Sequence, residues 1–196
     1  AGATGDAVEA RAVWLGRDLI HWPGAGTEGR FRLHRSLRGQ LLATPGARVR
    51  GSDGPLYPPM STLLEAAGIR PLQGWDPAHL APPPDLVVVG NAVRRDNPEA
   101  VEAERLGLPR LSMPEALARF FLADRRPLVV AGTHGKTTTS AMAAWVWSAC
   151  GRDPGFLIGG VPVDLVASFR RGGGDRFVVE GDEYNAAYFD RGAKFL

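Results

Sequence analysis

Cysteine is almost absent from this sequence: Cys150 is the single one among 196 residues. One thiol cannot form an internal disulfide, and no Cys/His cluster has the spacing of a zinc site. Long hydrophobic runs are missing too, since no apolar stretch approaches the roughly 18 residues needed to span a bilayer. These absences predict a cytoplasmic protein with no disulfide framework, no structural zinc and no membrane partner.

A strong excess of one charge sign is also lacking. The chain has 23 basic and 21 acidic residues, a net charge of +2. Arginines gather between Arg30 and Arg50, but a solvated helix face explains them more simply than a stripe that binds nucleic acid. A hydrophobic content of 44% with 22% charged residues is typical of a globular domain, and no nucleic-acid partner is predicted.

Short β-branched runs alternate with helical patterns along the chain. Strands are expected at residues 19–22, 47–53, 85–89, 128–131 and 177–180, and helices at 61–67, 98–106, 113–122 and 136–149. Asn97 before Pro98 predicts a capped helix start. Ser112 with Glu115 predicts a capping box. The alternation predicts an α/β fold whose parallel sheets are flanked by helices.

A polar stretch at residues 123–127 predicts a boundary between two domains. Residues 1–124 are expected to form a Rossmann-like parallel-sheet domain, in which residues 1–46 are irregular. Residues 125–196 are expected to start a P-loop ATPase domain. Because the chain has no initial methionine and stops at Leu196 inside an expected strand, we expect it to be a fragment.

A glycine-rich loop lies between the strand expected at 128–131 and the helix expected at 136–149. It reads Gly132-Thr133-His134-Gly135-Lys136-Thr137-Thr138. Glycines let backbone N–H groups converge on a phosphate, the helix N-terminus adds partial positive charge, and the lysine adds a mobile full charge. Thr137 offers a hydroxyl to Mg²⁺. The sequence therefore predicts that these seven residues bind the phosphates of ATP.

Two features of the loop leave alternatives open. Val130 stands where the common phosphate-loop pattern has its first glycine, so a glycine turn followed by a chance Lys-Thr pair is the competing interpretation. His134 is either a ligand or a histidine that faces solvent. Behind the loop, Met142, Trp145 and Trp147 are expected to be core residues of the helix.

The loop, with threonine and histidine before its second glycine and no upstream glycine, resembles the ATP loop of the Mur ligase family. Within that family its Thr-His form is similar to the branch that uses UDP-N-acetylmuramate as acceptor. Other stretches carry the same resemblance, over residues from about 47 to 196. They are Gly51-Ser52-Asp53, Tyr57-Pro58-Pro59-Met60-Ser61, Val89-Gly90-Asn91-Ala92, the run at 155–162, and Glu180-Gly181-Asp182-Glu183-Tyr184 followed by Phe189-Asp190-Arg191 and Lys194-Phe195.

The resemblance implies a ligase of peptidoglycan recycling that depends on ATP and Mg²⁺ and forms a C–N bond. The lactyl carboxylate of UDP-N-acetylmuramate would attack the γ-phosphate, and an amine would displace phosphate from the acyl phosphate. The stretches at 57–59 and 184–194 favour the murein tripeptide L-alanyl-γ-D-glutamyl-meso-diaminopimelate as that amine. Addition of L-alanine, a non-catalytic nucleotide-binding fragment, and more weakly a P-loop kinase or GTPase, stay open as alternatives.

The resemblance also implies roles for individual residues. Lys136 would neutralise the β- and γ-phosphates, Thr137 would ligate one Mg²⁺, and Glu180 would ligate a second. An ordinary acidic turn is the alternative for Glu180, and it stays equally open for Asp182 and Glu183. The remainder of the ATPase domain and a peptide-binding domain would lie beyond Leu196, so the 196-residue chain is expected not to complete a catalytic cycle.

The UDP sugar is expected at the carboxyl ends of the first domain's strands. Asp53 follows a strand at the place where an acid often binds a ribose, and Ser52 precedes it. Turn formation by Asp53 is the equal alternative. Asn91 follows the strand at 85–89 and either contacts the sugar nucleotide or stabilises a turn.

Three positions depart from the family pattern. The glycine-rich run at 24–29 has the place of the family's first UDP-sugar turn, but arginines follow it instead of small apolar residues, and a lone Gly-x-Gly-x-x-Gly pattern is weak. Gly181 stands where the family has alanine. Asn185 stands where aspartate is usual.

Overall fold

The computed structural model describes residues 11–15, 31–32, 44–45, 48–55, 72–165, 167–182 and 186–192. Several expected features lie outside these ranges: the strand at 19–22, the glycine turn at 24–29 and the helix at 61–67. The motif residues Tyr57, Glu183, Tyr184, Asn185 and Lys194 also lie outside them. The described residues form a mixed α/β structure with parallel sheets, as the alternation of strands and helices predicts.

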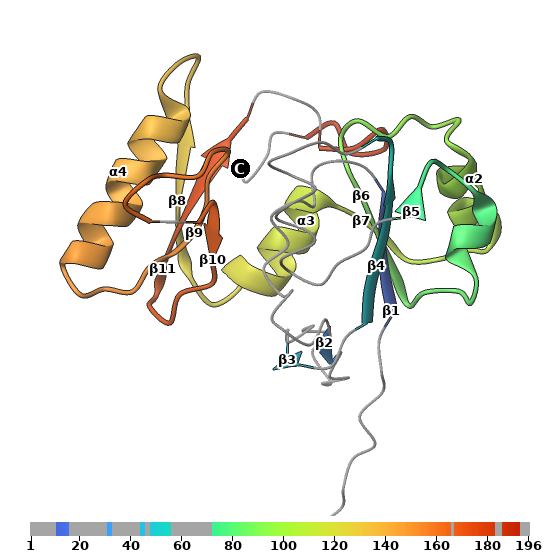
Figure 1. Cartoon of the computed structure of the whole chain (residues 1–196), viewed down its shortest axis with the longest axis horizontal. Coiled ribbons are helices and arrows are strands. Elements are labelled where there is room, and N and C mark those ends of the chain that lie inside the picture. Colours follow the sequence, from blue (N-terminus) through green and yellow to red (C-terminus); the bar gives the residue numbers. More distant parts are fainter. Residues whose placement is uncertain are drawn as a thin grey trace, which may run out of the picture. The chain divides into compact units, whose positions relative to one another are not determined.

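The first compact unit is built on a parallel sheet, seen in Figure 1. Its described strands are β1 (Arg11–Leu15), β4 (Arg48–Asp53), β5 (Leu72–Gln73), β6 (Leu86–Val89) and β7 (Arg110–Ser112), in the order β5-β4-β1-β6-β7. The expected strands at 47–53 and 85–89 are confirmed as β4 and β6. The central strand, β1, was not expected; it pairs with β4 on one side and β6 on the other. A separate antiparallel pair joins β2 (Phe31–Arg32) to β3 (Thr44–Pro45).

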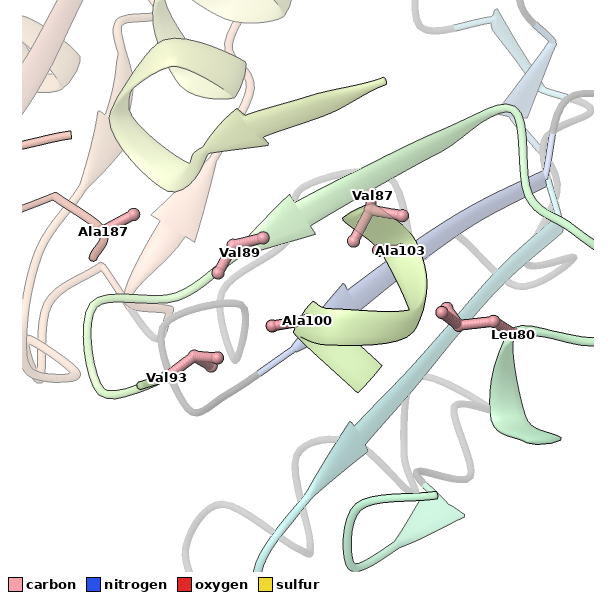
Figure 2. Close-up of a cluster of buried hydrophobic side chains, with 7 residues drawn as sticks. All are labelled: Leu80, Val87, Val89, Val93, Ala100, Ala103 and Ala187. Atoms are coloured by element: carbon pink, nitrogen blue, oxygen red, sulfur yellow. The ribbon is translucent and has the colours of Figure 1, made fainter. Parts of the chain in front are cut away.

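Apolar side chains on one face of β6 form the core of the first unit, shown in Figure 2. All four residues of β6 are buried, as expected for a strand whose sheet is covered on both faces. The core cluster joins β6 to the 3-10 helix η2 (Pro77–Leu80) and to α2 (Pro98–Arg105). Its members are Leu80, Val87, Val89, Val93, Ala100, Ala103 and Ala187. Burial of each large aliphatic side chain contributes about 1.5–3 kcal/mol.

The start of α2 is capped as the sequence predicts. Asn97 is the N-cap, and its side-chain oxygen accepts hydrogen bonds from the Glu99 and Ala100 amides at 2.9 and 3.2 Å. Pro98, which has no N–H to satisfy, occupies the first turn. The helix ends at Arg105, one residue before the expected end, and Gly107 follows it at φ 63°.

The second compact unit has a mainly parallel sheet of its own. Its described strands are β8 (Arg126–Ala131), β9 (Gly155–Leu157), β10 (Phe169–Arg170) and β11 (Arg176–Gly181), in the order β10-β9-β11-β8. Strands β8, β11 and β9 are parallel, and β10 runs antiparallel to β9. The expected strands at 128–131 and 177–180 are confirmed as β8 and β11. Helix α4 (Lys136–Ala149) has the predicted bounds and packs on β11 and β8.

One face of α4 is exposed, which corrects part of the sequence expectation. Ala144 is fully buried in a cluster with Phe156, Ile158 and Val178, and Trp147 packs against this cluster. Met142 and Trp145, expected in the core, are 63% and 49% exposed. Residues 142 and 145 share a stripe on the helix face away from position 144, because successive residues are about 100° apart around an α-helix. Among the described helices, none has both the length and the apolar character that crossing a membrane demands.

The division between the two units falls before the polar stretch. The first unit contains the described residues up to Met113 together with Ala187–Phe189, and the second contains Pro114–Ala186 and the residues from Asp190 onward. The polar stretch predicts the boundary after Asp124. Helix α3 (Met113–Leu117) and the π-helical turn η3 (Ala118–Leu122) belong mainly to the second unit, since Phe121 of η3 is buried there with its ring edge-on to Phe169.

Candidate functional site

The loop between β8 and α4 has the backbone that its glycines predict. Gly132 and Gly135 adopt φ values of 146° and 75°, a region that L side chains disfavour. Gly135 is the N-cap of α4, and no side chain caps this helix start. The first N–H groups of an α-helix have no acceptor within the helix, so this N-terminus is suited to an anion.

The place of Val130 explains the missing first glycine. Val130 is still part of β8, where it pairs with Glu180 of β11 and packs against the Ala144 cluster. A glycine at this position would lose that packing. The loop therefore begins only at Gly132, one residue after the strand ends.

The ammonium group of Lys136 lies over the loop. Its Nζ donates a hydrogen bond to the Gly132 carbonyl oxygen at 2.8 Å. Thr133, His134 and Thr138 are exposed. Because Nζ is already at the loop, the lysine needs little rearrangement to reach a phosphate bound there.

The structure brings together the two predicted metal ligands. Thr137 Oγ1 donates a hydrogen bond to Glu180 Oε2 at 3.2 Å. The other carboxylate oxygen, Oε1, accepts a hydrogen bond from the Gly159 amide at 2.9 Å. Both oxygens of Glu180 are thus oriented, one by a helix start and one by the segment after β9.

The donor pair of Thr137 and Glu180 fits Mg²⁺. Among the described residues there is no group of three or more His, Cys, Asp or Glu side chains that could hold a metal ion. Mg²⁺ at nucleotide sites takes one or two protein oxygens and completes its shell with phosphate and water. Thr137 and Glu180 supply such a pair of oxygens beside the phosphate loop.

An apolar pocket of about 340 Å³ adjoins the loop on the α4 side. It is lined by Thr138, Ala141, Met142, Trp145, Val146, Pro162, Asp164 and Leu165. Sequence patterns do not predict this pocket, because the apolar character of Met142 and Trp145 indicates core positions. The two side chains form part of its wall instead.

The predicted UDP-sugar residues lie at one edge of the first unit's sheet. Ser52 and Asp53 end β4, and both are buried, at 0% and 4% exposure. Asp53 Oδ1 accepts a hydrogen bond from the Gly54 amide at 2.7 Å, so the turn role expected as the alternative is present. Asn91 lies two residues after β6, in the turn closed by the Val93 amide and the Gly90 carbonyl. In the sheet register Leu15 of β1 pairs with Ser52 on one side and Val89 on the other, so these segments flank the end of β1.

A buried polar cluster beside Ser52 is not predicted by the sequence. His79 Nδ1 donates a hydrogen bond to Glu99 Oε1 at 2.7 Å, and Ser52 Oγ lies 3.3 Å from the same nitrogen. Glu99 is fully buried and also accepts a hydrogen bond from the Asp76 amide at 3.0 Å. Its Oε2 has no hydrogen-bond partner in the part of the chain that is described. No local pattern links residues 20 positions apart, so only the fold reveals the cluster.

The comparisons with known proteins identify the same family as the resemblance. The protein-family model described as "Mur ligase family, catalytic domain" matches residues 36–125 of the sequence. The chain is 51% identical over 151 residues to the UDP-N-acetylmuramate–L-alanyl-γ-D-glutamyl-meso-2,6-diaminoheptandioate ligase of Escherichia coli K12. The matched region covers 77% of this chain and 33% of that protein. The chain is 41% identical over 189 residues to the UDP-N-acetylmuramate–L-alanine ligase of Kineococcus radiotolerans, covering 95% of this chain and 38% of that protein.

A solved structure extends the similarity to the fold. The crystal structure of the UDP-N-acetylmuramate:L-alanyl-γ-D-glutamyl-meso-diaminopimelate ligase of Neisseria meningitidis matches with a TM-score of 0.78 at 35% identity, covering 96% of this chain and 57% of that one. The chain spans about a third of the length of the curated relatives that it matches. Motif, fold and sequence identity agree, and the chain belongs to the Mur ligase family.

Proposed function

We propose that this chain carries the ATP-binding and UDP-sugar-binding residues of a cytoplasmic, Mg²⁺-dependent ligase of peptidoglycan recycling. The ligase would join UDP-N-acetylmuramate to the murein tripeptide L-alanyl-γ-D-glutamyl-meso-diaminopimelate. The observation that carries the proposal is the 3.2 Å hydrogen bond from Thr137 to Glu180 directly behind the glycine loop. The 51% identity to the E. coli protein of that name favours the tripeptide as the amine.

The two predicted domains are part of the same proposal. Residues 1–124 would form a Rossmann-like domain for the UDP sugar, and residues 125–196 would begin the ATPase domain. The strand order β5-β4-β1-β6-β7 supports the first assignment, because it is the doubly wound order in which β1 marks the reversal. Ligands of such sheets bind at the carboxyl ends of the strands, where Ser52, Asp53 and Asn91 lie.

In the proposed ATP site, each side chain has a separate task. The loop would surround the phosphates with backbone amides, those of Gly132, Thr133, His134, Gly135 and Thr138. Lys136 would move its ammonium group from the Gly132 carbonyl to the β- and γ-phosphates. Bound Mg²⁺ would offset the repulsion between the attacking carboxylate and the γ-phosphate. Removing this charge barrier is what allows two anions to react.

The geometry refines the assignment of the metal ligands. Adjacent ligands of an octahedral Mg²⁺ lie about 3.0 Å apart when each metal–oxygen bond is about 2.1 Å. Thr137 Oγ1 and Glu180 Oε2 are 3.2 Å apart. This separation allows one ion to be ligated by both oxygens, whereas the family resemblance implies a separate ion for each.

L-Alanine addition is the second candidate for the reaction. The relative from K. radiotolerans is a UDP-N-acetylmuramate–L-alanine ligase, and its match covers 95% of this chain. The ATP site would be the same in both reactions, so it does not distinguish them. A substrate test of the full-length gene product does: tripeptide-dependent phosphate release without an L-alanine response supports the proposal, and a response to L-alanine alone contradicts it.

The ATP site itself is tested by calorimetry. Lys136→Ala is expected to weaken ATP binding about 10- to 100-fold, the effect of one charge-assisted contact of about 1.5–3 kcal/mol. Arg152→Ala is the matched control, because it removes the same charge from an exposed position after α4. Equal ATP affinities for wild type and Lys136→Ala, with and without Mg²⁺, would remove the basis of the proposed function.

A further inference from the structure

The segment after β9 contacts Glu180 of the proposed metal site and passes close to Thr137. The Gly159 amide donates to Glu180 Oε1 at 2.9 Å. A Cβ atom at Gly159 would lie 3.3 Å from Glu180 Oε2 and 3.8 Å from both Cδ and Oε1. At the next position, a Cβ atom on Gly160 would lie 3.4 Å from Thr137 Cγ2. A side chain at position 159 would therefore press lightly against the carboxylate.

The direction of the Gly159 amide is fixed by its neighbour. Ile158 is fully buried in the Ala144 cluster, and its own amide donates to the Ser168 carbonyl at 2.8 Å. A residue anchored by both side chain and backbone holds the next peptide group in one orientation. The N–H that meets Glu180 therefore belongs to the residue directly after an anchored one.

We propose that Gly159 is a positioning residue for the metal ligand Glu180. Its amide binds Oε1 and so directs Oε2 to Thr137, where a cation bound by both oxygens would be held. A hydrogen bond to one oxygen of a ligating carboxylate fixes its rotation and strengthens metal binding, and loss of such support typically lowers metal affinity about 10- to 100-fold. The inference deepens the proposed function and rests on it.

The test is a double-mutant cycle of Gly159→Pro with Glu180→Ala. Calorimetry with ATP, titrated with and without Mg²⁺, measures how far Mg²⁺ raises ATP affinity in each protein. Gly159→Pro should reduce this Mg²⁺ effect about tenfold in the wild-type background, because proline has no amide hydrogen to donate to Glu180 Oε1. In the Glu180→Ala background it should change the effect less than about twofold, since no carboxylate remains to accept the hydrogen bond.

A second measurement needs no glycine variant. In amide NMR spectra, the resonance of the Gly159 amide proton should lie further upfield in Glu180→Ala than in the wild-type chain. The reason is that the hydrogen bond to the carboxylate is lost. For the calorimetry, Gly192→Pro is the matched control, because it removes an exposed glycine amide that also donates to a carboxylate, Asp190 Oδ1, at 3.1 Å.

The outcomes separate the two proposals. A wild-type chain whose ATP affinity does not respond to Mg²⁺ overturns the proposed function and this inference together. A wild-type chain that does respond, with a Gly159→Pro effect that is absent or equally large in both backgrounds, overturns this inference alone. An unmoved Gly159 proton also overturns it, whatever the calorimetry of the Gly159 variant.

Discussion

The hydroxyl of Thr137 and the carboxylate of Glu180 are joined by a 3.2 Å hydrogen bond, although 43 positions separate them in the chain. The contact exists because β8 and β11 are parallel neighbours, with Val130 paired to Glu180. Strand β8, which leads into the phosphate loop, and strand β11, which carries Glu180 near its end, therefore finish at the same edge of the sheet. Adjacent parallel strands place a hydroxyl donor and a carboxylate at one site without any proximity in sequence.

Glu180→Gln is the substitution that separates charge from shape at this site. The glutamine side chain keeps the size and an acceptor oxygen, but it is a weaker Mg²⁺ ligand because it is neutral. We expect Mg²⁺-dependent ATP affinity to fall about 10- to 100-fold, corresponding to about 1.5–3 kcal/mol, while Mg²⁺-free affinity holds or improves slightly. Calorimetry measures both. Asp175→Asn, which removes the same charge from an exposed turn, should leave both affinities unchanged, and a similar drop in that variant would mean that net charge alone is responsible.

Local signals in the sequence are enough for the features that depend on local chemistry. The bounds of α4 and the Asn97 cap follow from glycine, proline and amide side chains acting within a few residues. The glycine loop and the ends of β4 and β11 are predictable in the same way. The loop pattern indicates both the backbone geometry and the chemistry, so it identifies Lys136 as a candidate site residue, and the family resemblance adds Glu180.

Features that depend on distant partners are not predictable from such signals. Strand β1 has only five residues, and its central position comes from pairing with β4 and β6. The Gly159 amide meets Glu180 across 21 positions, which no motif encodes. The exposure of Trp145 depends on which stripe of α4 faces the sheet, and a helix made almost entirely of apolar and small residues has little amphipathic signal to decide this.

Asn97→Ala should destabilise the first unit by removing the cap of α2. The Glu99 and Ala100 amides would lose their acceptor, and loss of an N-cap side chain costs about 1 kcal/mol, within a range of about 0.5–2 kcal/mol. Asn97→Asp keeps an acceptor oxygen at the N-terminus, and it should retain most of the stability. Urea unfolding measures the difference between the two variants. Equal midpoints for Asn97→Ala and the wild type would show that the cap contributes nothing.

Gly181→Ala introduces the residue that the family pattern has at this position. A Cβ atom there would lie 2.9 Å from Val129 Cγ1, closer than a normal contact. The valine must shift, and overpacking of this kind costs about 1–3 kcal/mol in the free energy of unfolding. The double variant with Val129→Ala should lose less stability than the sum of the two single variants. Additive losses in urea unfolding would show that the two side chains do not compete for space.

Glu99→Ala should destabilise the first unit strongly, because it removes a fully buried carboxylate that two donors share. The Asp76 amide and His79 Nδ1 would both lose their acceptor, and each unsatisfied donor costs about 1–3 kcal/mol. Glu104→Ala is the control on the same helix, because that side chain is 60% exposed and should contribute little. Hydrogen exchange of the β6 and α2 amides locates any loss in the first unit.

The same substitution reaches the proposed UDP-sugar site through His79. Without Glu99 the imidazole is no longer fixed beside Ser52, which lies 3.3 Å from its Nδ1. We therefore expect UDP-N-acetylmuramate affinity to fall in Glu99→Ala, while ATP affinity at the other unit's loop is kept. His79→Ala should weaken UDP-sugar binding in the same direction with a smaller loss of stability, because the Asp76 amide keeps its bond to Glu99. If ATP and UDP-sugar affinities decline together in either variant, the effect is general unfolding and not the orientation of Ser52.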